Sequence, residues 1–187
     1  MTLAQQSWTD IYDTFYPTQT LTRDILERHS RSVAGLALDI NSRLQLGLPD
    51  DLVEQAAMLH DIGIFLTDAP SIGCFGSQPY LLHGVLGADL LRRHGFDEQI
   101  ARVAERHTGS GITAAEIEQW HLPFPTDRIL APQTLLEQLI CYADKFYSKS
   151  GDMQRKPLER VRASLAKFGD LSLARFEQLH TRFNTDL

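Results

Sequence analysis

The chain has 187 residues, of which 43% are hydrophobic and 22% charged, and its formal net charge is −6 at pH 7. These proportions are typical of a globular protein with one hydrophobic core, so we expect a single domain over residues 1–187. The negative charge, without any Lys/Arg-rich run, excludes a broad surface for a nucleic-acid polymer. No segment has the pattern of a secretory signal or the length of a membrane span, so we expect a cytoplasmic protein that does not bind membranes.

The N-terminal part of the sequence is predicted to be helical. Ser7 and Asp10 have the spacing of a capping box and open a short helix, which forms an N-terminal arm and closes at Pro17. A longer helix with an apolar stripe is expected over residues 21–46, and Gly47 is its predicted terminator.

The stretch "AAMLHDIGIF" at residues 56–65 completes the helix that Pro49 opens. Gly63 is the predicted stop of this helix. The carboxylate of Asp61 is placed at the negative end of the helix dipole, where an anion is unfavourable without a positive partner. We therefore expect a cation close to Asp61.

The rest of the chain is also predicted to be helical, apart from two irregular segments. "TDAPSIGCFGSQP" at residues 67–79 is predicted to be a surface loop, with a lid over the functional site as the alternative. The Pro-rich residues 121–132 form the second connection. Because no segment alternates with a period of two, the fold class is predicted to be all-α. Further helices are expected at about residues 80–94, 97–107, 113–120 and 133–149, with two closing helices that start at Pro157 and Asp170.

Five helices each place one ionisable residue on their apolar face, namely His29, His60, His83, His107 and Asp144. Taken alone, each His is explained as a hydrogen-bonded core residue. Together with Asp61, however, they bring four imidazoles and two carboxylates into one core, which is costly unless the groups are paired or bind a cation. The remaining candidates, His94, His121 and His180, are left out of this set.

The ligand types restrict the metal. Cys74 and Cys141 are isolated, which excludes a Cys-type zinc site and a disulfide framework. Imidazole and carboxylate ligands suit iron, manganese, cobalt, nickel or zinc, and six ligands exceed the needs of one tetrahedral zinc ion. Two metal ions that share a carboxylate fit this set better.

The ordered set of His29, His60-Asp61, His83, His107 and Asp144 resembles the H...HD...H...H...D pattern of the HD-domain superfamily, and of its HDIG-containing members in particular. The similarity covers about residues 20–150, and "HGVLGADLLRRHGFDEQIARVAERHTGSGIT" and "LICYADKFYSK" are especially similar to small prokaryotic members. It implies an all-α bundle of about five core helices around a metal site. The N-terminal arm and a C-terminal helical extension over residues 151–187 would be added to that core.

The resemblance also implies two divalent metal ions, iron or manganese in the first place, with cobalt, nickel, zinc or magnesium as alternatives. One ion would be held by His29, His60 and Asp144 and the other by His83 and His107, with Asp61 bridging the two. A metal-bridged hydroxide would then attack a nucleotide or another small phosphate ester. The expected activity is that of a metal-dependent phosphohydrolase.

Basic residues adjoin three of the expected ligands. Lys145, in the "ADK" context, is the preferred phosphate contact and is expected to act in catalysis together with Asp61. Arg28 and Arg106 are further candidates for substrate binding, with solvation at the surface as the alternative. Thr108, in the "TGSG" turn, offers a hydroxyl group to an anion.

Two other activities remain open at this point. Some HD proteins with the same six ligands are oxygenases, which use a mixed-valent di-iron pair to cleave C–C or C–P bonds with O2. A non-catalytic signalling domain ranks last, because all six ligands are present here. The chain also departs from many relatives, which carry a basic residue after HDIG, whereas Ile64 and Phe65 stand here and predict a more apolar cavity entrance. The sequence does not indicate the oligomeric state.

Overall fold

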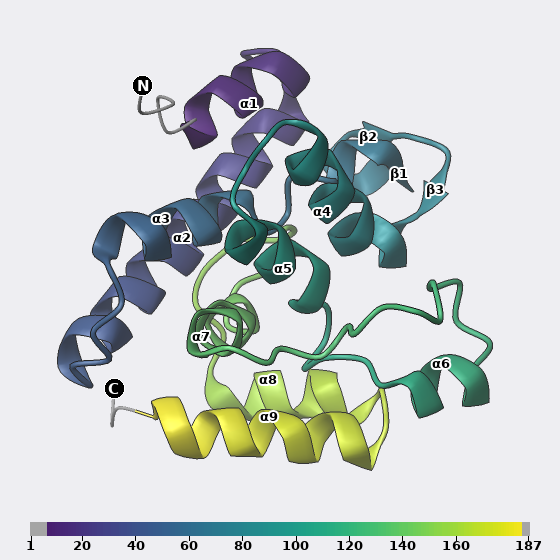
Figure 1. Cartoon of the computed structure of the whole chain (residues 1–187). Helices are drawn as coiled ribbons and strands as arrows, with labels where there is room; N and C mark the ends of the chain where they lie inside the picture. Colours follow the sequence, from purple (N-terminus) through teal and green to yellow (C-terminus); the bar gives the residue numbers. More distant parts are fainter. Residues whose placement is uncertain (1–6, 185–187) are drawn as a thin grey trace.

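The computed structural model describes residues 7–184, which form a helical bundle with a small sheet at one side (Figure 1). This architecture confirms the predicted all-α class. None of the helices in this range combines the length and hydropathy needed to cross a bilayer. The helices are α1 (Trp8–Phe15), α2 (Leu21–Arg43), α3 (Asp50–Leu59), α4 (His83–Arg93), α5 (Glu98–Arg106), α6 (Ala114–Gln119), α7 (Leu135–Asp144), α8 (Leu158–Ala166) and α9 (Asp170–Phe183).

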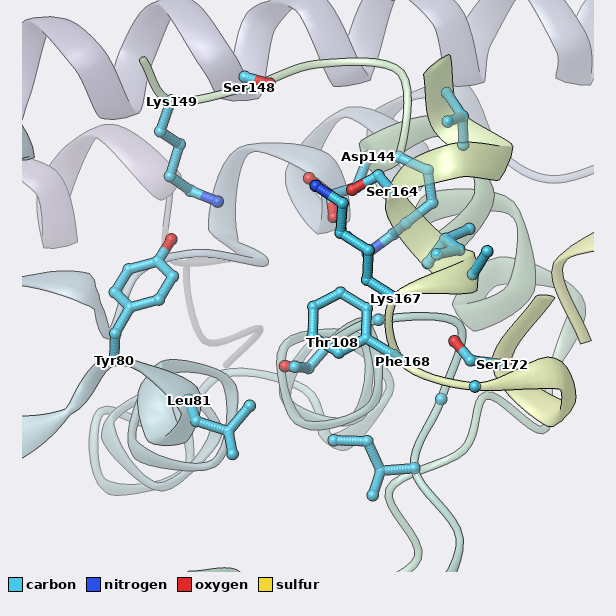
Figure 2. Close-up of a pocket in the computed structure, with 18 of the residues that line it drawn as sticks. Tyr80, Leu81, Thr108, Asp144, Ser148, Lys149, Ser164, Lys167, Phe168 and Ser172 are labelled. Carbon is cyan, nitrogen blue, oxygen red and sulfur yellow. The ribbon is translucent and has the colours of Figure 1, made fainter. Parts of the chain in front are cut away.

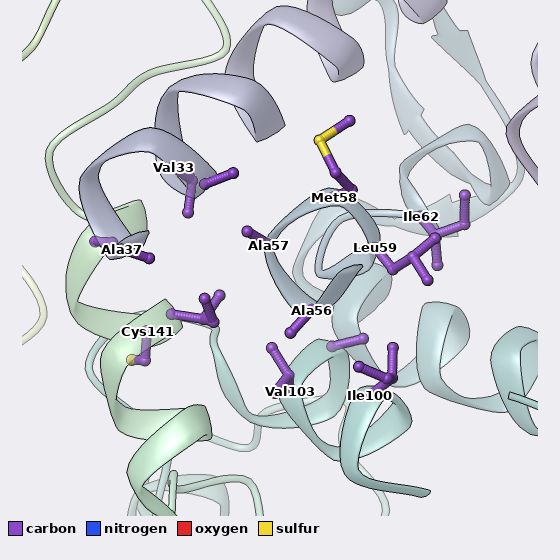
Figure 3. Close-up of a cluster of buried hydrophobic side chains, with 14 of the residues drawn as sticks. Val33, Ala37, Ala56, Ala57, Met58, Leu59, Ile62, Ile100, Val103 and Cys141 are labelled. Atoms are coloured by element: carbon purple, nitrogen blue, oxygen red, sulfur yellow. The ribbon is translucent and has the colours of Figure 1, made fainter. Parts of the chain in front are cut away.

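Helix α3 lies in the middle of the bundle and packs against α2, α5 and α7. Its small side chains Ala56 and Ala57 are fully buried, which lets the neighbouring helices approach closely. Figure 3 shows these residues among Val33 of α2, Val103 of α5 and Cys141 of α7. The packing therefore brings together the helices on which four of the five inward-facing ionisable residues were expected.

Helices α8 and α9 lie along the bottom of the view in Figure 1, on the side of α7. The ring of Tyr142 on α7 stacks on Phe176 of α9 at a centroid distance of 5.7 Å and lies 5.6 Å from Phe183. Val161 and Leu165 of α8 belong to the same buried cluster. The C-terminal extension is thus joined to the bundle by aromatic and aliphatic packing.

Most helix starts agree with the sequence, whereas two helices end earlier than expected. The capping boxes at Ser7 and Thr113 are formed. The second helix ends at Arg43, because Gln45 and Gly47 adopt left-handed backbone angles with φ of 51° and 75°. Helix α7 ends at Asp144, and the chain that follows it turns into the functional site.

Residues 67–79 are not a plain loop, which corrects the prediction. They contain three short strands, β1 (Thr67–Ala69), β2 (Cys74–Phe75) and β3 (Gln78–Pro79), and β1 pairs antiparallel with β2 and parallel with β3. Thr67, Ile72 and Cys74 are buried and attach the segment to the core. Strands of two or three residues are too short to show an alternating pattern, so they leave no strand signal in the sequence. The 3-10 turns η1 (Ile64–Leu66), η2 (Pro70–Ile72) and η3 (Tyr80–Leu82) connect these strands to the helices.

Gly63 does not act as the expected left-handed stop, because its φ of −86° is available to any residue. A Cβ atom at this position would lie 2.2 Å from the carbonyl oxygen of His83 and 2.5 Å from the backbone nitrogen of Gly87. The glycine is therefore needed for contact between the backbone after α3 and helix α4. This contact sets the position of His83 relative to Asp61.

We expect Gly63→Ala to lower the free energy of unfolding by about 3 kcal/mol, because the added methyl group meets backbone atoms that cannot move independently. Gly35→Ala is the matched control, since Gly35 is exposed on α2 and a Cβ there has no neighbour within 4 Å. It should raise stability by about 0.5–1 kcal/mol through helix propensity. Urea unfolding of both variants measures the difference, and equal stability would contradict the packing role.

Candidate metal centre

The six predicted ligands meet at one place inside the bundle. His29 lies in the middle of α2, His60 and Asp61 directly follow α3, and His83 is the first residue of α4. His107 directly follows α5 and Asp144 ends α7. All six are buried. They form two groups with ligand atoms within 4.8 Å of one another, one of His29, His60, Asp61 and Asp144 and one of Asp61, His83 and His107.

Asp61 is the residue that the two groups share. Its Oδ2 atom lies 3.1 Å from Nε2 of His29 and 3.0 Å from Nε2 of His60. Its Oδ1 atom lies 3.2 Å from Nε2 of His83 and 3.3 Å from Nε2 of His107. The two oxygens of one carboxylate thus face two different pairs of imidazoles, as a bridging ligand requires.

Backbone carbonyls orient three of the imidazoles. The Nδ1 atoms of His60, His83 and His107 lie 2.6, 2.7 and 2.7 Å from the carbonyl oxygens of the residues three positions earlier. A carbonyl only accepts, so we assign a proton to Nδ1 of all three, and Nε2 is the atom directed at the carboxylates, with a free lone pair wherever the imidazole is neutral. A free lone pair on Nε2 and the carboxylate oxygen that it faces repel each other unless a cation lies between the two atoms. Imidazoles fixed in this way are typical of metal ligands.

The hydrogen bonding of Asp61 also fits a bound cation. Both of its carboxylate oxygens are buried, and within residues 7–184 neither makes a hydrogen bond of regular geometry. A buried carboxylate without such partners depends on nearby positive charge, and the ammonium group of Lys149 lies 2.6 Å from Oδ2. The residues present therefore fit cations, one in each of the two ligand groups.

The charges of the carboxylates control the protonation of the neighbouring imidazoles. Burial alone would lower the pKa of His60, but the charges of Asp61 and Asp144 outweigh it and raise this pKa to about 9. Burial lowers the pKa of His107 to about 3. Burial would raise the pKa of Asp61, but His60 and Lys149 hold it well below its usual range. The site thus attracts positive charge most strongly around His60 and Asp61.

Lysine side chains lie against both carboxylates, and sequence reasoning identified only one of them. Nζ of Lys145 lies 2.7 Å from Oδ2 of Asp144 and donates to the carbonyl of His107 at 2.9 Å. Lys149 was missed, yet its Nζ lies 2.6 Å from Oδ2 of Asp61 and 5.9 Å from the ring centroid of Tyr80. The only sequence signal was its place in "LICYADKFYSK", four residues after Lys145.

The structure does not support Arg28 or Arg106 as substrate contacts. Arg28 is exposed on α2 and pairs with Asp24 at 3.4 Å. Arg106 is buried and committed to Glu137, whose carboxylate lies 3.0 Å from its guanidinium. Neither lines the cavity described below, whereas Thr108 does.

The prediction of a more apolar entrance at Ile64 and Phe65 is wrong. Ile64 is fully buried. Phe65 stacks on Phe15 of α1 at 5.3 Å and lines a different pocket, beside Tyr16 and Pro17. The turn after Asp61 packs Phe65 against the N-terminal arm, and neither side chain lines the cavity beside the candidate ligands.

A cavity of about 980 Å³ opens beside the ligands, and Asp144, Lys145 and Lys149 form part of its wall (Figure 2). Burial lowers the pKa of Lys156, and the ammonium groups of Lys145 and Lys149 act in the same direction although Asp144 opposes them. This cavity is basic, in contrast to the net negative charge of the whole chain. Its charged lining residues are Lys145, Lys149, Lys156, Lys167 and Arg175 against Asp144 and Glu116.

Fold and site together define a helical domain with a candidate centre for two metal ions. The model of the HD domain family matches residues 26–148, so the chain belongs to the HD-domain family. Among solved structures, the HD domain of the L. monocytogenes phosphodiesterase PgpH is similar with a TM-score of 0.54 and 16% identity. The match covers 92% of this chain and 94% of that chain, and at this identity it supports the fold alone.

Two archaeal tRNA (cytidine(56)-2'-O)-methyltransferases are similar in sequence. The protein of Thermoplasma volcanium is 32% identical over 163 residues, which cover 87% of this chain and 43% of that protein. The protein of Picrophilus torridus is 31% identical over 137 residues, which cover 72% of this chain and 35% of that protein. The chain thus spans less than half the length of these relatives.

The metal-free protein should lose stability as the pH falls from about 6 to 4, by about 1 kcal/mol per pH unit. Folded His107 stays neutral because burial lowers its pKa to about 3, whereas the unfolded residue binds a proton below about pH 6.5. The low pKa values of Asp61 and Asp144 add to the loss only below about pH 4. Urea unfolding in EDTA measures the slope. It should flatten in His107→Gln but not in the control His121→Asn, an exposed site, and equal slopes in both would contradict this account.

Proposed function

We propose that this chain is a metal-dependent phosphohydrolase that acts on small phosphate esters, nucleotides among them. The observation that carries the proposal is that one buried carboxylate, Asp61, joins two ligand groups beside a basic cavity. Two adjacent metal sites suit phosphate ester hydrolysis, and lysines in the wall suit an anionic substrate. The structural neighbour, which is named a phosphodiesterase, shares the fold on which this site is built.

In this proposal, His29, His60 and Asp144 would hold one ion and His83 and His107 the second, and Asp61 would serve both because it belongs to both groups. When bound, the ions would supply an activated water and neutralise charge on the phosphoryl group. Iron or manganese best suits the mixed imidazole and carboxylate set. Lys145 positions Asp144 and the backbone after His107, and it is therefore proposed as a positioning residue.

Lys149 is proposed as the phosphate contact. Its ammonium group lies at Oδ2 of Asp61, on the same atom that faces His29 and His60. A divalent cation bound to Oδ2 would repel the ammonium group, which has room to turn into the cavity that Lys149 also lines. There it would meet an anionic substrate next to the metal ligands.

Two other functions are less well supported. An HD-type oxygenase would use the same six ligands, and the basic wall favours an anionic substrate, a phosphate or a phosphonate, over an uncharged one. The two methyltransferases match this chain over only 43% and 35% of their own lengths. We therefore propose no methyl transfer for this chain.

The purified chain should bind about two divalent ions, measured by elemental analysis after loading with Mn2+ or Fe2+. We expect His29→Ala and His83→Ala each to retain about one ion, because each removes a ligand from a different group, and Asp61→Asn to weaken both sites. His180→Gln is the control, since His180 pairs with Tyr142 on the far side of α7. Wild-type content in Asp61→Asn would contradict the bridging assignment.

Phosphate release from a panel of phosphorylated metabolites, with Mn2+ or Co2+ added, tests the activity. We expect Lys149→Met to lower kcat/KM by about 10- to 100-fold with the metal content unchanged, because a charge-assisted hydrogen bond to phosphate is lost. Arg28→Met, a change of an exposed cation away from the cavity, should have no effect. A mixed-valent iron signal with O2 consumption and no phosphate release would overturn the hydrolase in favour of the oxygenase.

A further inference from the structure

One wall of the cavity comes from the turn between α8 and α9, after the last residue of the HD match. The match ends at residue 148, whereas Lys167, Phe168 and Ser172 line the cavity. Figure 2 shows these side chains on one side of the opening and Tyr80 and Lys149 on the other. The metal ligands and the facing wall therefore belong to different parts of the chain.

This wall carries the aromatic side chain of Phe168, which is exposed and is therefore not held in place by packing in the core. Phe168 is 66% exposed, and Trp120, from the turn after α6, is 60% exposed. Single exposed apolar residues are common, but these two line the same cavity. Leu171, only three residues from Phe168 and 65% exposed, does not line it. Exposed aromatic rings inside a ligand-sized cavity are suited to contact a ligand.

Within the described residues, the lysines of the cavity that have no ion-pair partner also belong to the C-terminal extension. Lys145 and Lys149 are paired with Asp144 and Asp61. Within the described residues, Lys156 and Lys167 line the cavity without an ion-pair partner. Residues from the C-terminal extension thus add positive charge as well as an aromatic surface to the site.

The cavity is also larger than a phosphate group requires. Its volume of about 980 Å³ is at the upper end of the range of about 300–1,000 Å³ that holds drug-sized ligands. If the phosphate lies at Asp144 and Lys149, as the proposed function requires, most of this volume is left for the rest of the substrate. That remainder would be bounded by Phe168 and Trp120.

We propose that the α8–α9 turn is the recognition wall of the site, where Phe168 stacks on the base of a nucleoside phosphate. The inference rests on the proposed function for the position of the phosphate and deepens it by naming the substrate class. Lys156 and Lys167 attract the anionic ester, and Trp120, which lines the same cavity, offers a second aromatic surface to the base. Base–aromatic stacking accepts any base, so the wall selects for a planar ring rather than for one nucleotide.

Binding of two probes tests this wall without any need for turnover. The probes are the phosphonate analogues of AMP and of ribose 5-phosphate, in which a methylene group replaces the ester oxygen and prevents hydrolysis. Calorimetry with the Mn2+-loaded full chain measures both affinities. We expect the AMP analogue to bind at least about tenfold more tightly than the ribose analogue, which is the order of one stacking contact.

Phe168→Ala should reduce this preference to about twofold or less while the affinity for the ribose analogue stays unchanged, and Phe168→Tyr should restore it. Leu171→Ala, the matched exposed residue outside the cavity, should keep the wild-type preference. An unchanged preference in Phe168→Ala would overturn the proposed recognition wall. The same conclusion would follow if the wild-type protein bound neither probe, or bound both with equal affinity.

The two proposals fail in different ways. A Phe168-dependent preference for the AMP analogue without phosphate release from AMP or other nucleotides would leave the recognition wall standing and overturn the hydrolase. Phosphate release from AMP and ribose 5-phosphate with equal kcat/KM, unaffected by Phe168→Ala, would support the hydrolase and overturn the wall.

Discussion

The burial of Asp61 between four imidazoles is the constraint on which the rest of the site depends. A carboxylate in a protein core is costly, and its two oxygens face histidines from α2, the end of α3, α4 and the end of α5. The field of Asp61 and Asp144 draws positive charge into this place, whether as a proton on His60, as the ammonium group of Lys149 or as a divalent ion. This common demand for a cation explains why the two lysines after α7 lie against the carboxylates.

The backbone holds the imidazoles in the geometry that this demand requires. Carbonyls of Ala57, Tyr80 and Ala104 each accept from the Nδ1 atom of a histidine and so direct its Nε2 atom inward. Close backbone contact at Gly63 sets the distance between the turn after α3 and α4. The site is therefore built on the packing of rigid elements, which keeps ligand atoms within a few ångströms of each other.

In the proposals above, chemical work and recognition fall to different parts of the cavity. The HD core supplies the ligands, Lys145 and Lys149, whereas the α8–α9 turn supplies Phe168 and Lys167. Packing of α9 on Tyr142 fixes that turn against the end of α7. A change of the extension would thus alter the substrate that the same arrangement of candidate ligands meets, which agrees with the principle that function is set by sites rather than by folds.

The sequence by itself determined the all-α class, most helix starts and the set of six inward-facing residues, because helical periodicity and capping are local properties. It did not reveal the short strands after Leu66, the early end of α7 or the packing role of Gly63, which depend on contacts between distant segments. Only the tertiary structure decided which basic side chains reach the site. Lys149 lies at Asp61 and Arg106 is turned to Glu137, because bundle packing, and not adjacency to a ligand in the chain, sets where a long side chain ends.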